Sequence, residues 1–356
     1  MAKGPVSKIG GAHAPSGFES QRLRHQFKDT QVSLNYLKDE VEELNAIEIE
    51  NLTKRFKNHT VLDSIYLNVE DGKCFSLIGP NGAGKSTLIK ILTTLLKPSS
   101  GKVLIFGHPL KDRKSIRKRI ALVSENTVFY DQLSALENLL FFAGLYHVPK
   151  KIAEYQAEKL LKMVEMWRWR DKPIKSFSTG MRQRINLVRG LMHSPDLLFL
   201  DEPTLALDPQ TSNIIIEAIK DIKKKGITVF FTSHIMKNVE DLADEIAVIN
   251  EGKIIFQGSL AELKSNFTSS KREMEISFES ESQAWQGYEI LKDLVKNDIN
   301  VKKRSILLSL REPQLLRDVL FQITKNGLAI KDVNTHSSSL EKIFIELTTD
   351  NKKEKR

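Results

Sequence analysis

The stretch GPNGAGKST, residues 79–87, decides the fold class of this 356-residue chain. It directly follows the apolar run CFSLI at 74–78 and directly precedes LIKILTTLL at 88–96. The spacing G-x-x-x-x-G-K-[ST] between a strand and a helix is the pattern of a phosphate-binding loop, or P-loop. Its glycines let successive backbone N–H groups point at phosphate oxygens, and the following helix adds the positive end of its dipole. The sequence therefore predicts a nucleotide site in a strand–loop–helix unit.

The side chains of this loop predict how a nucleoside triphosphate and Mg²⁺ are held. Lys85 is expected to reach the β- and γ-phosphates, and the Ser86 hydroxyl is expected to bind Mg²⁺. The residues expected to surround the phosphates are Gly79, Pro80, Asn81, Gly82, Ala83, Gly84, Lys85, Ser86 and Thr87.

Two acidic residues end a second apolar run, DLLFLDEPT at 196–204. A charge at the end of a buried strand needs a group that offsets its desolvation, and a metal–nucleotide complex is such a group. Asp201 is therefore expected to hold Mg²⁺, and Glu202 to orient and polarise the water that attacks the γ-phosphate. In isolation the same stretch would indicate only a strand-to-loop boundary.

A histidine follows a third apolar run, ITVFFTSHIM at 227–236. The carboxyl ends of strands in an α/β sheet converge on the ligand crevice, which would place His234 near Lys85 and Glu202 to sense the γ-phosphate. Taken alone, a histidine there is more often a cap or a core residue.

The stretch FSTGM at 177–181 stands ahead of the basic run RQRINLVRG. On their own, Ser178 and Gly180 indicate a helix cap and a turn. Together, however, the phosphate loop, FSTGM, LLFLDEPT, LALDP and TSHI resemble the ATP-binding domain of an ABC transporter over about residues 47–260. The resemblance implies an α/β fold, a P-loop NTPase of ABC type with a helical subdomain, and ATP and Mg²⁺ as cofactors.

The resemblance also implies roles for side chains that their own pattern leaves open. In that family a P-loop and a signature sequence close on the same ATP from opposite subunits, which assigns Ser178 and Gly180 to the partner's ATP. Phe56 in LTKRFKNHTVL would stack on adenine. Asp208 in LALDP would belong to the loop that meets the other subunit, and YDQLSALENLLFF would lie near the docking contact with a membrane subunit.

Three departures from the family pattern stand out. The usual signature is Leu-Ser-Gly-Gly-Gln, from which Phe177, Thr179 and Met181 differ. The glutamine expected in IALVSEN is replaced by Glu125, whose carboxylate can still bind Mg²⁺ but adds a negative charge near the triphosphate. Leu205 stands where the family commonly has serine, which would change the contacts between subunits.

Composition narrows the setting. No apolar run approaches the roughly 18 residues that span a bilayer, and the N-terminus lacks the apolar core of a signal peptide. The single cysteine, Cys74, excludes an internal disulfide and suits a reducing compartment. The net charge of +9 is spread over short clusters that fit solvated helix faces, with phosphate-bearing partners as the alternative.

The pattern along the chain predicts four parts. Residues 1–46 read as a disordered segment with a short amphipathic helix. Residues 47–262 read as the ATP-binding domain, with a helical insert at about 126–175. Residues 268–348 alternate strand and helix patterns as a small α+β accessory domain, similar to the extension of the drug- and sodium-export branch (ABC-2 type) of the family, and 349–356 is a charged tail.

The sequence thus predicts an ATP-hydrolysing subunit that powers a separate membrane-spanning permease and works as part of an exporter. The resemblance implies a head-to-tail dimer, homo- or heterodimeric, held peripherally at the cytoplasmic face of the cell membrane, with no nucleic acid bound. One alternative is a soluble ABC ATPase acting on ribosomes or nucleic acid, which the positive charge favours and the single ATPase domain disfavours. Another is a non-catalytic, ATP-binding regulatory partner in a heterodimer, which Glu125 suggests.

Overall fold

A computed structural model describes residues 45–124, 128–267, 272–295, 299–310, 313–336 and 340–350, all within the unit Asn45–Arg356. The predicted segment 1–46 lies outside the described residues except for Asn45 and Ala46, which begin a strand. Glu125 and residues 351–356 of the predicted tail lie outside them as well. Over the described ranges, no helix combines the length and apolar character that a bilayer crossing requires.

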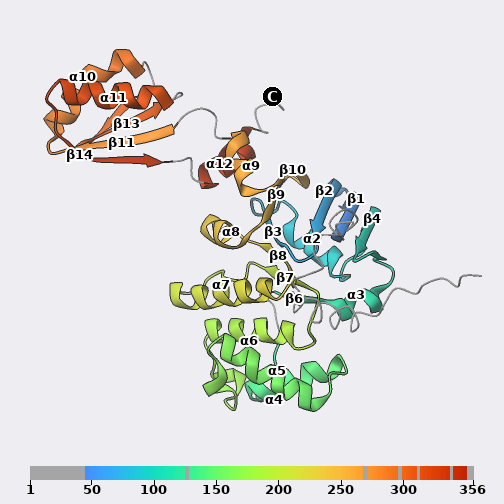
Figure 1. Cartoon of the computed structure of the whole chain (residues 1–356). Coiled ribbons are helices and arrows are strands. Elements are labelled where there is room, and N and C mark those ends of the chain that lie inside the picture. Colours follow the sequence, from blue (N-terminus) through green and yellow to red (C-terminus); the bar gives the residue numbers. More distant parts are fainter. Residues whose placement is uncertain are drawn as a thin grey trace, which may run out of the picture. The chain divides into compact units, whose positions relative to one another are not determined.

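A six-stranded sheet forms the centre of the larger part (Figure 1). Adjacent strands of this sheet run parallel, except for the two strands at one edge, which pair antiparallel. The strands are, in spatial order, β10 (Lys253–Gly258), β9 (Glu245–Asn250), β3 (Cys74–Ile78), β8 (Thr228–Thr232), β7 (Leu197–Asp201) and β6 (Ile120–Val123).

The apolar runs in the sequence form the inner strands because both faces of the sheet are covered. Along β7, Phe199 points to one core while Leu198 points to the other, as the two-residue repeat of a strand requires. The neighbouring strand β8 divides in the same way, with Phe230 in the first core and Phe231 in the second. A continuous hydrophobic run is therefore the pattern expected of these strands.

One core lies between the six-stranded sheet, α2 (Lys85–Leu92) and a second, antiparallel sheet. The strand order of this second sheet is β2-β1-β4-β5, and α3 (Arg113–Arg119) follows its last strand in the chain. The strands of this sheet are β1 (Asn45–Phe56), β2 (His59–Glu70), β4 (Ser100–Ile105) and β5 (His108–Pro109).

The other core lies under the helices that follow β6. Figure 1 shows α4, α5 and α6 grouped together below α7. The predicted helical insert corresponds to α4, α5 and two short 3₁₀ turns. The elements are α4 (Ala135–Leu145), α5 (Lys150–Met163), the turns Trp167–Trp169 and Ile174–Ser176, α6 (Thr179–Leu191), α7 (Pro209–Lys224) and α8 (Met236–Leu242).

A third sheet near the C-terminus has a hydrophobic core of its own, which includes Ile276, Phe278 and Ile306. Its chain order is β-α-β-β-α-β and its spatial order is β12-β13-β11-β14, antiparallel throughout, which is a ferredoxin-like arrangement. The elements are β11 (Arg272–Phe278), α10 (Glu281–Val295), β12 (Ile299–Lys302), β13 (Ser305–Leu310), α11 (Pro313–Lys325) and β14 (Ile330–His336).

The last helix, α12 (Leu340–Asp350), contributes Leu340 and Ile343 to the core of the larger part. It contacts α9 (Leu260–Phe267), and Asn250 Nδ2 donates to Thr348 O at 3.4 Å. The chain thus returns to the larger part after forming the third sheet. The domain boundaries at 262, 268 and 348 stay a prediction.

Candidate nucleotide site

The predicted phosphate loop connects β3 to α2, as the strand–loop–helix pattern requires. Its glycines are needed for two different reasons. Gly84 precedes α2 with a left-handed φ of 111°, a conformation that costs glycine little. Gly79 has no room for a side chain, because a Cβ there would lie 2.4 Å from Ile249 O. The loop therefore passes close against β9 before the helix begins.

Lys85 is the first residue of α2, and its side chain is buried. Its Nζ donates to Gly79 O at 2.6 Å and to Pro80 O at 3.2 Å, both within the loop. Burial lowers the pKa of Lys85, and the nearby carboxylates of Glu202 and Asp201 oppose that change. The ammonium group is thus held inside the loop and in electrostatic contact with both acids. Ser86, the next residue, lies in the first turn of α2.

The two predicted acids lie where β7 ends, beside Thr232 at the end of β8. Thr232 is fully buried, and its Oγ1 donates to Asp201 Oδ1 at 2.8 Å. Thr232 Oγ1 also accepts a hydrogen bond from the Glu202 backbone N–H at 3.0 Å. Glu202 has a left-handed φ of 50°, which is uncommon outside glycine. One hydroxyl therefore fixes both acids relative to β8.

His234 follows β8 and contacts Glu202 directly. Its Nδ1 lies 2.9 Å from Glu202 Oε2, and its backbone N–H donates to the same oxygen at 3.3 Å. The His234 side chain is 49% exposed whereas that of Glu202 is 18% exposed, so the histidine lies on the open side of the pair.

The parallel strands β3, β8 and β7 are neighbours in the sheet, so their carboxyl ends meet at one edge. This edge brings together Lys85, Asp201, Glu202 and His234, the four residues that the motifs singled out. A glycine-rich loop, a cation and two carboxylates at one sheet edge are groups that phosphoryl transfer uses.

Phe56 ends β1, opposite His59 in the hairpin with β2. Its ring is 45% exposed, and Lys54 Nζ lies 4.8 Å from the ring centroid. The start of β2 lies against the phosphate loop, because a Cβ on Gly84 would lie 3.0 Å from Val61 O. The hairpin thus presents an accessible aromatic side chain from the sheet that borders the loop.

Ser178 and Gly180 open α6, which lies apart from α2 in Figure 1. Ser178 Oγ caps the helix by accepting Met181 N–H at 3.3 Å. A Cβ on Gly180 would lie 2.9 Å from the Thr211 methyl carbon, so the helix approaches α7 closely there. Ser178, which carries the hydroxyl at the start of α6, is exposed and lies outside the core of its own chain.

Two of the three unusual signature residues have a packing reason. Phe177 is buried in the core under α6, and Met181 packs against that core. Larger apolar side chains at these positions therefore anchor the start of α6. Nothing in the structure explains Thr179.

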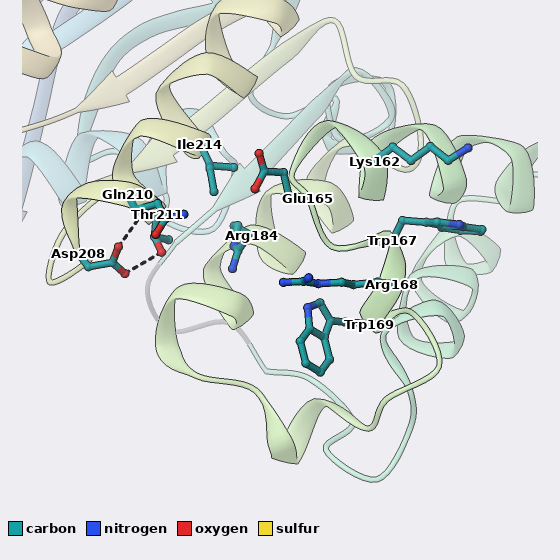
Figure 2. Close-up of a pocket in the computed structure, with 10 residues that line it drawn as sticks. All are labelled: Lys162, Glu165, Trp167, Arg168, Trp169, Arg184, Asp208, Gln210, Thr211 and Ile214. Carbon is teal, nitrogen blue, oxygen red and sulfur yellow. Dashed lines mark hydrogen bonds between the residues drawn. The ribbon is translucent and has the colours of Figure 1, made fainter.

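A groove of about 760 Å³ lies beside α6 (Figure 2). Its walls include the turn Trp167–Trp169, Arg184 and the start of α7, where Asp208 accepts hydrogen bonds from Thr211 N and Oγ1 at 2.9 and 2.7 Å. Burial lowers the pKa of Arg184, and the carboxylates of Glu165 and Asp208 oppose that change. Arg184 of α6 is thus in the electrostatic field of the loop that carries Asp208.

The described residues fit a magnesium ion that is shared with phosphate rather than enclosed by protein. Over these ranges, no three histidine, cysteine, aspartate or glutamate side chains gather into a set able to hold a metal ion. Mg²⁺ is commonly bound through one or two carboxylates plus substrate phosphates. Asp201 supplies a carboxylate at the strand edge and Ser86 a hydroxyl on the helix after the loop, which meets that pattern.

Three polar residues that the motifs did not single out contact predicted site residues or their chain neighbours. They are Thr232, Gln183, whose Nε2 donates to Pro203 O at 3.2 Å, and Asn186, whose Nδ2 donates to Ser124 O at 2.8 Å. For Thr232 a signal was present, because a hydroxyl ends an apolar run whose carboxyl end was predicted to reach the ligand crevice. For the two amides no signal was present, since polar residues on a helix usually face solvent.

Known proteins resemble the chain along most of its length. A profile of the family described as ABC transporter matches residues 62–205. The chain is 30% identical over 307 residues to the linearmycin resistance ATP-binding protein LnrL of Bacillus subtilis, which covers 85% of this chain and 98% of that protein. It is 32% identical over 306 residues to the daunorubicin/doxorubicin resistance ATP-binding protein DrrA of Streptomyces peucetius, covering 85% and 92%.

A solved relative is a dimeric post-hydrolysis state of an ATP-binding cassette bound to ADP and phosphate. It has 27% identity and a TM-score of 0.56, and the match covers 60% of this chain and 98% of that one. The predicted fold class, an α/β P-loop ATPase of ABC type with a helical subdomain and a small C-terminal α+β domain, is confirmed.

Proposed function

Since the chain belongs to the ABC transporter family as an ATP-binding subunit of the exporter type, we propose that it drives a separate membrane-spanning permease as a head-to-tail dimer with ATP at the interface. Proteins of this family hydrolyse ATP and couple that hydrolysis to transport, and the chain is an ATPase of this kind. The proposal adds the partner, the dimer, the location and the roles of individual residues.

The observation that carries the proposal is the gathering of Lys85, Glu202 and His234 at the ends of adjacent parallel strands. Lys85 binds the β- and γ-phosphates from within its loop. Glu202 orients and polarises the attacking water and accepts its proton. His234, held on the Glu202 carboxylate, contacts the γ-phosphate from the open side. Phe56 stacks on the adenine ring.

The residues Ser86, Asp201 and Glu125 would hold Mg²⁺ with the phosphates. When bound, Mg²⁺ neutralises charge on the β- and γ-phosphates. The part that the chain itself plays is to orient Asp201 through the Thr232 hydroxyl before nucleotide arrives.

The dimer uses the exposed start of α6. Ser178 and Gly180 of one subunit bind the γ-phosphate that Lys85 of the other subunit holds, and Asp208 lies in the loop beside that contact. The exposed Ser178 hydroxyl and the dimeric form of the solved relative support this arrangement.

The permease docks on a cluster of exposed aromatic and aliphatic side chains before, on and directly after α4, which we call the α4 surface. It comprises Tyr130, Phe141, Leu145 and Tyr146, each at least 41% exposed. Large apolar side chains gathered in one exposed region indicate a contact surface. A subunit docked there lies peripherally at the cytoplasmic face of the membrane. The relatives, ATP-binding proteins of drug resistance, favour this reading over action on ribosomes or nucleic acid.

The variant Glu202→Gln tests the assignment of the general base. The amide keeps the size of the side chain but cannot accept a proton, so turnover should fall at least roughly 100-fold. ATP should then hold the variant as a dimer in size-exclusion chromatography. The control is Glu217→Gln, which changes an exposed glutamate on α7 paired with Lys220. Near-normal ATPase activity in Glu202→Gln would overturn the assignment.

A further inference from the structure

We propose that three polar side chains of α6, Gln183, Asn186 and Arg189, form a relay that couples the α4 surface to the loop that carries Glu202. This α6 relay rests on the proposed function, which assigns docking to the α4 surface and proton abstraction to Glu202. Its members are positioning residues, because they act through the elements they bind.

The catalytic end of the relay is Gln183. Its Nε2 donates to the carbonyl of Pro203 at 3.2 Å, and Pro203 is the residue directly after Glu202. The Glu202 N–H is already fixed by Thr232 on the other side. The left-handed backbone of Glu202 is thus held by one hydrogen bond at its own N–H and one at the next carbonyl. A shift of α6 therefore moves the carboxylate relative to the phosphate loop.

The centre of the relay is Asn186, which is 2% exposed. Its Nδ2 donates to Ser124 O at 2.8 Å and lies 3.5 Å from Gln183 Oε1. Ser124 directly follows β6, the edge strand beside β7. Hydrogen bonds are strengthened in a buried, low-dielectric setting, and an amide left without partners there is costly. Asn186 therefore cannot move without disturbing the end of β6 or its contact with Gln183.

The surface end of the relay is Arg189. Its Nη2 donates to Asn186 Oδ1 at 3.1 Å, and its guanidinium carbon lies 5.0 Å from the ring centroid of Phe142 on α4. Phe142 in turn packs edge-on against Phe141 at 5.5 Å and lies 6.3 Å from Tyr130. Both of these rings belong to the exposed α4 surface. The contacts run without a gap from that surface to Pro203.

The first test replaces Gln183 by methionine, which has a similar length but no donor for Pro203 O. Coupling residues of this kind change rates by roughly 2- to 30-fold, and the kcat of ATP hydrolysis by the purified full chain should fall within that range. The KM for ATP should stay within about twofold, because the phosphate loop is untouched. The control Gln156→Met removes a comparable bond, to Ser194 Oγ at 2.8 Å, outside the relay.

A second variant separates the hydrogen bond from packing. Gln183→Lys keeps an N–H donor for Pro203 O at the end of a side chain that is one bond longer, so its kcat is expected to lie above that of Gln183→Met. Equal kcat in the two variants, or a fall in kcat matched by a rise in KM, would contradict the positioning role. Melting temperatures near that of the unaltered chain establish that each variant is folded.

The second test asks whether the α4 surface is coupled to Gln183. A double-mutant cycle combines Phe142→Leu with Gln183→Met and measures kcat for all four chains. The relay predicts that Phe142→Leu changes kcat by a smaller factor once Gln183 is methionine. Factors that simply multiply would overturn the relay and leave the proposed function standing, whereas an unaltered chain without ATPase activity would overturn both.

Discussion

Thr232 shows how much one buried side chain contributes to the site. It donates to Asp201 and accepts from Glu202, so the two acids share one hydroxyl. A second threonine of β8, Thr228, is equally buried and also makes two bonds, to Asp71 Oδ1 and from Gly72 N–H, both at 2.8 Å. The two residues differ in what they bind, not in how deeply they lie.

Thr232→Val should lower turnover by roughly 10- to 100-fold, because small displacements of catalytic groups have effects of this size. Thr228→Val is the matched control and should leave turnover unchanged. Both variants should lose a similar free energy of unfolding, on the order of 1–3 kcal/mol, since each leaves a buried partner unsatisfied. ATPase rates beside urea unfolding curves measure the two effects. Equal losses of turnover would show that Thr232 acts only through stability.

Among the elements, α4 and α6 begin in the same way. Ser134 and Ser178 have identical cap angles, φ −64° and ψ 165°, and each accepts the N–H three residues on. Ser134 belongs to a capping box with Glu137, whereas Ser178 has no such partner and begins the helix that follows the signature. A comparison of Ser134 with Ser178 therefore distinguishes the effect of helix capping from the effect of phosphate contact.

Ser178→Ala and Ser134→Ala should each lower the free energy of unfolding by about 1 kcal/mol. Only Ser178→Ala should lower ATP turnover, by roughly 10- to 100-fold, which corresponds to a lost hydrogen bond to a charged group. Parallel ATPase assays and thermal unfolding of the two variants check this. An unimpaired Ser178→Ala would reduce the serine to a helix cap.

Structure within one continuous segment was predictable from the sequence, whereas contacts between separate helices and strands were not. Residues 74–96 were predictable because strand, loop and helix are covalent neighbours with a fixed spacing. The bridge from Thr232 to Asp201 joins residues 31 positions apart and depends on the register of β7 against β8. Similarly, the alternating pattern of 268–348 predicted strands and helices, but such a pattern does not say which core will receive the last helix, α12.

On the scale of the whole molecule, the third sheet has its own core while α12 returns to the core of the larger part. Ile343 of α12 is fully buried in the core of the larger part, and Ile276 is fully buried in the core of the third sheet. The predicted accessory domain, 268–348, contains both residues, but their separate cores imply that these two isoleucines stabilise different unfolding units.

Calorimetry with and without ATP distinguishes the two units, because ligand raises only the transition of the part that binds it. Ile343→Ala should lower the ATP-responsive transition, at a cost of about 2–5 kcal/mol. Ile276→Ala should lower a separate transition and leave the ATP-responsive one in place. If both variants lower the same transition equally, the chain unfolds as one unit and the two cores do not stabilise it separately.

In the proposed dimer each ATP site takes Lys85 from one subunit and Ser178 from the other, and mixing two inactive chains tests this arrangement. Lys85→Ala and Ser178→Arg should each be inactive alone. In a two-fold dimer with composite sites, a mixed pair regains one intact site, so an equal mixture should recover about a quarter of the unaltered activity. Activity that stays at the level of the separate variants after mixing would contradict the account.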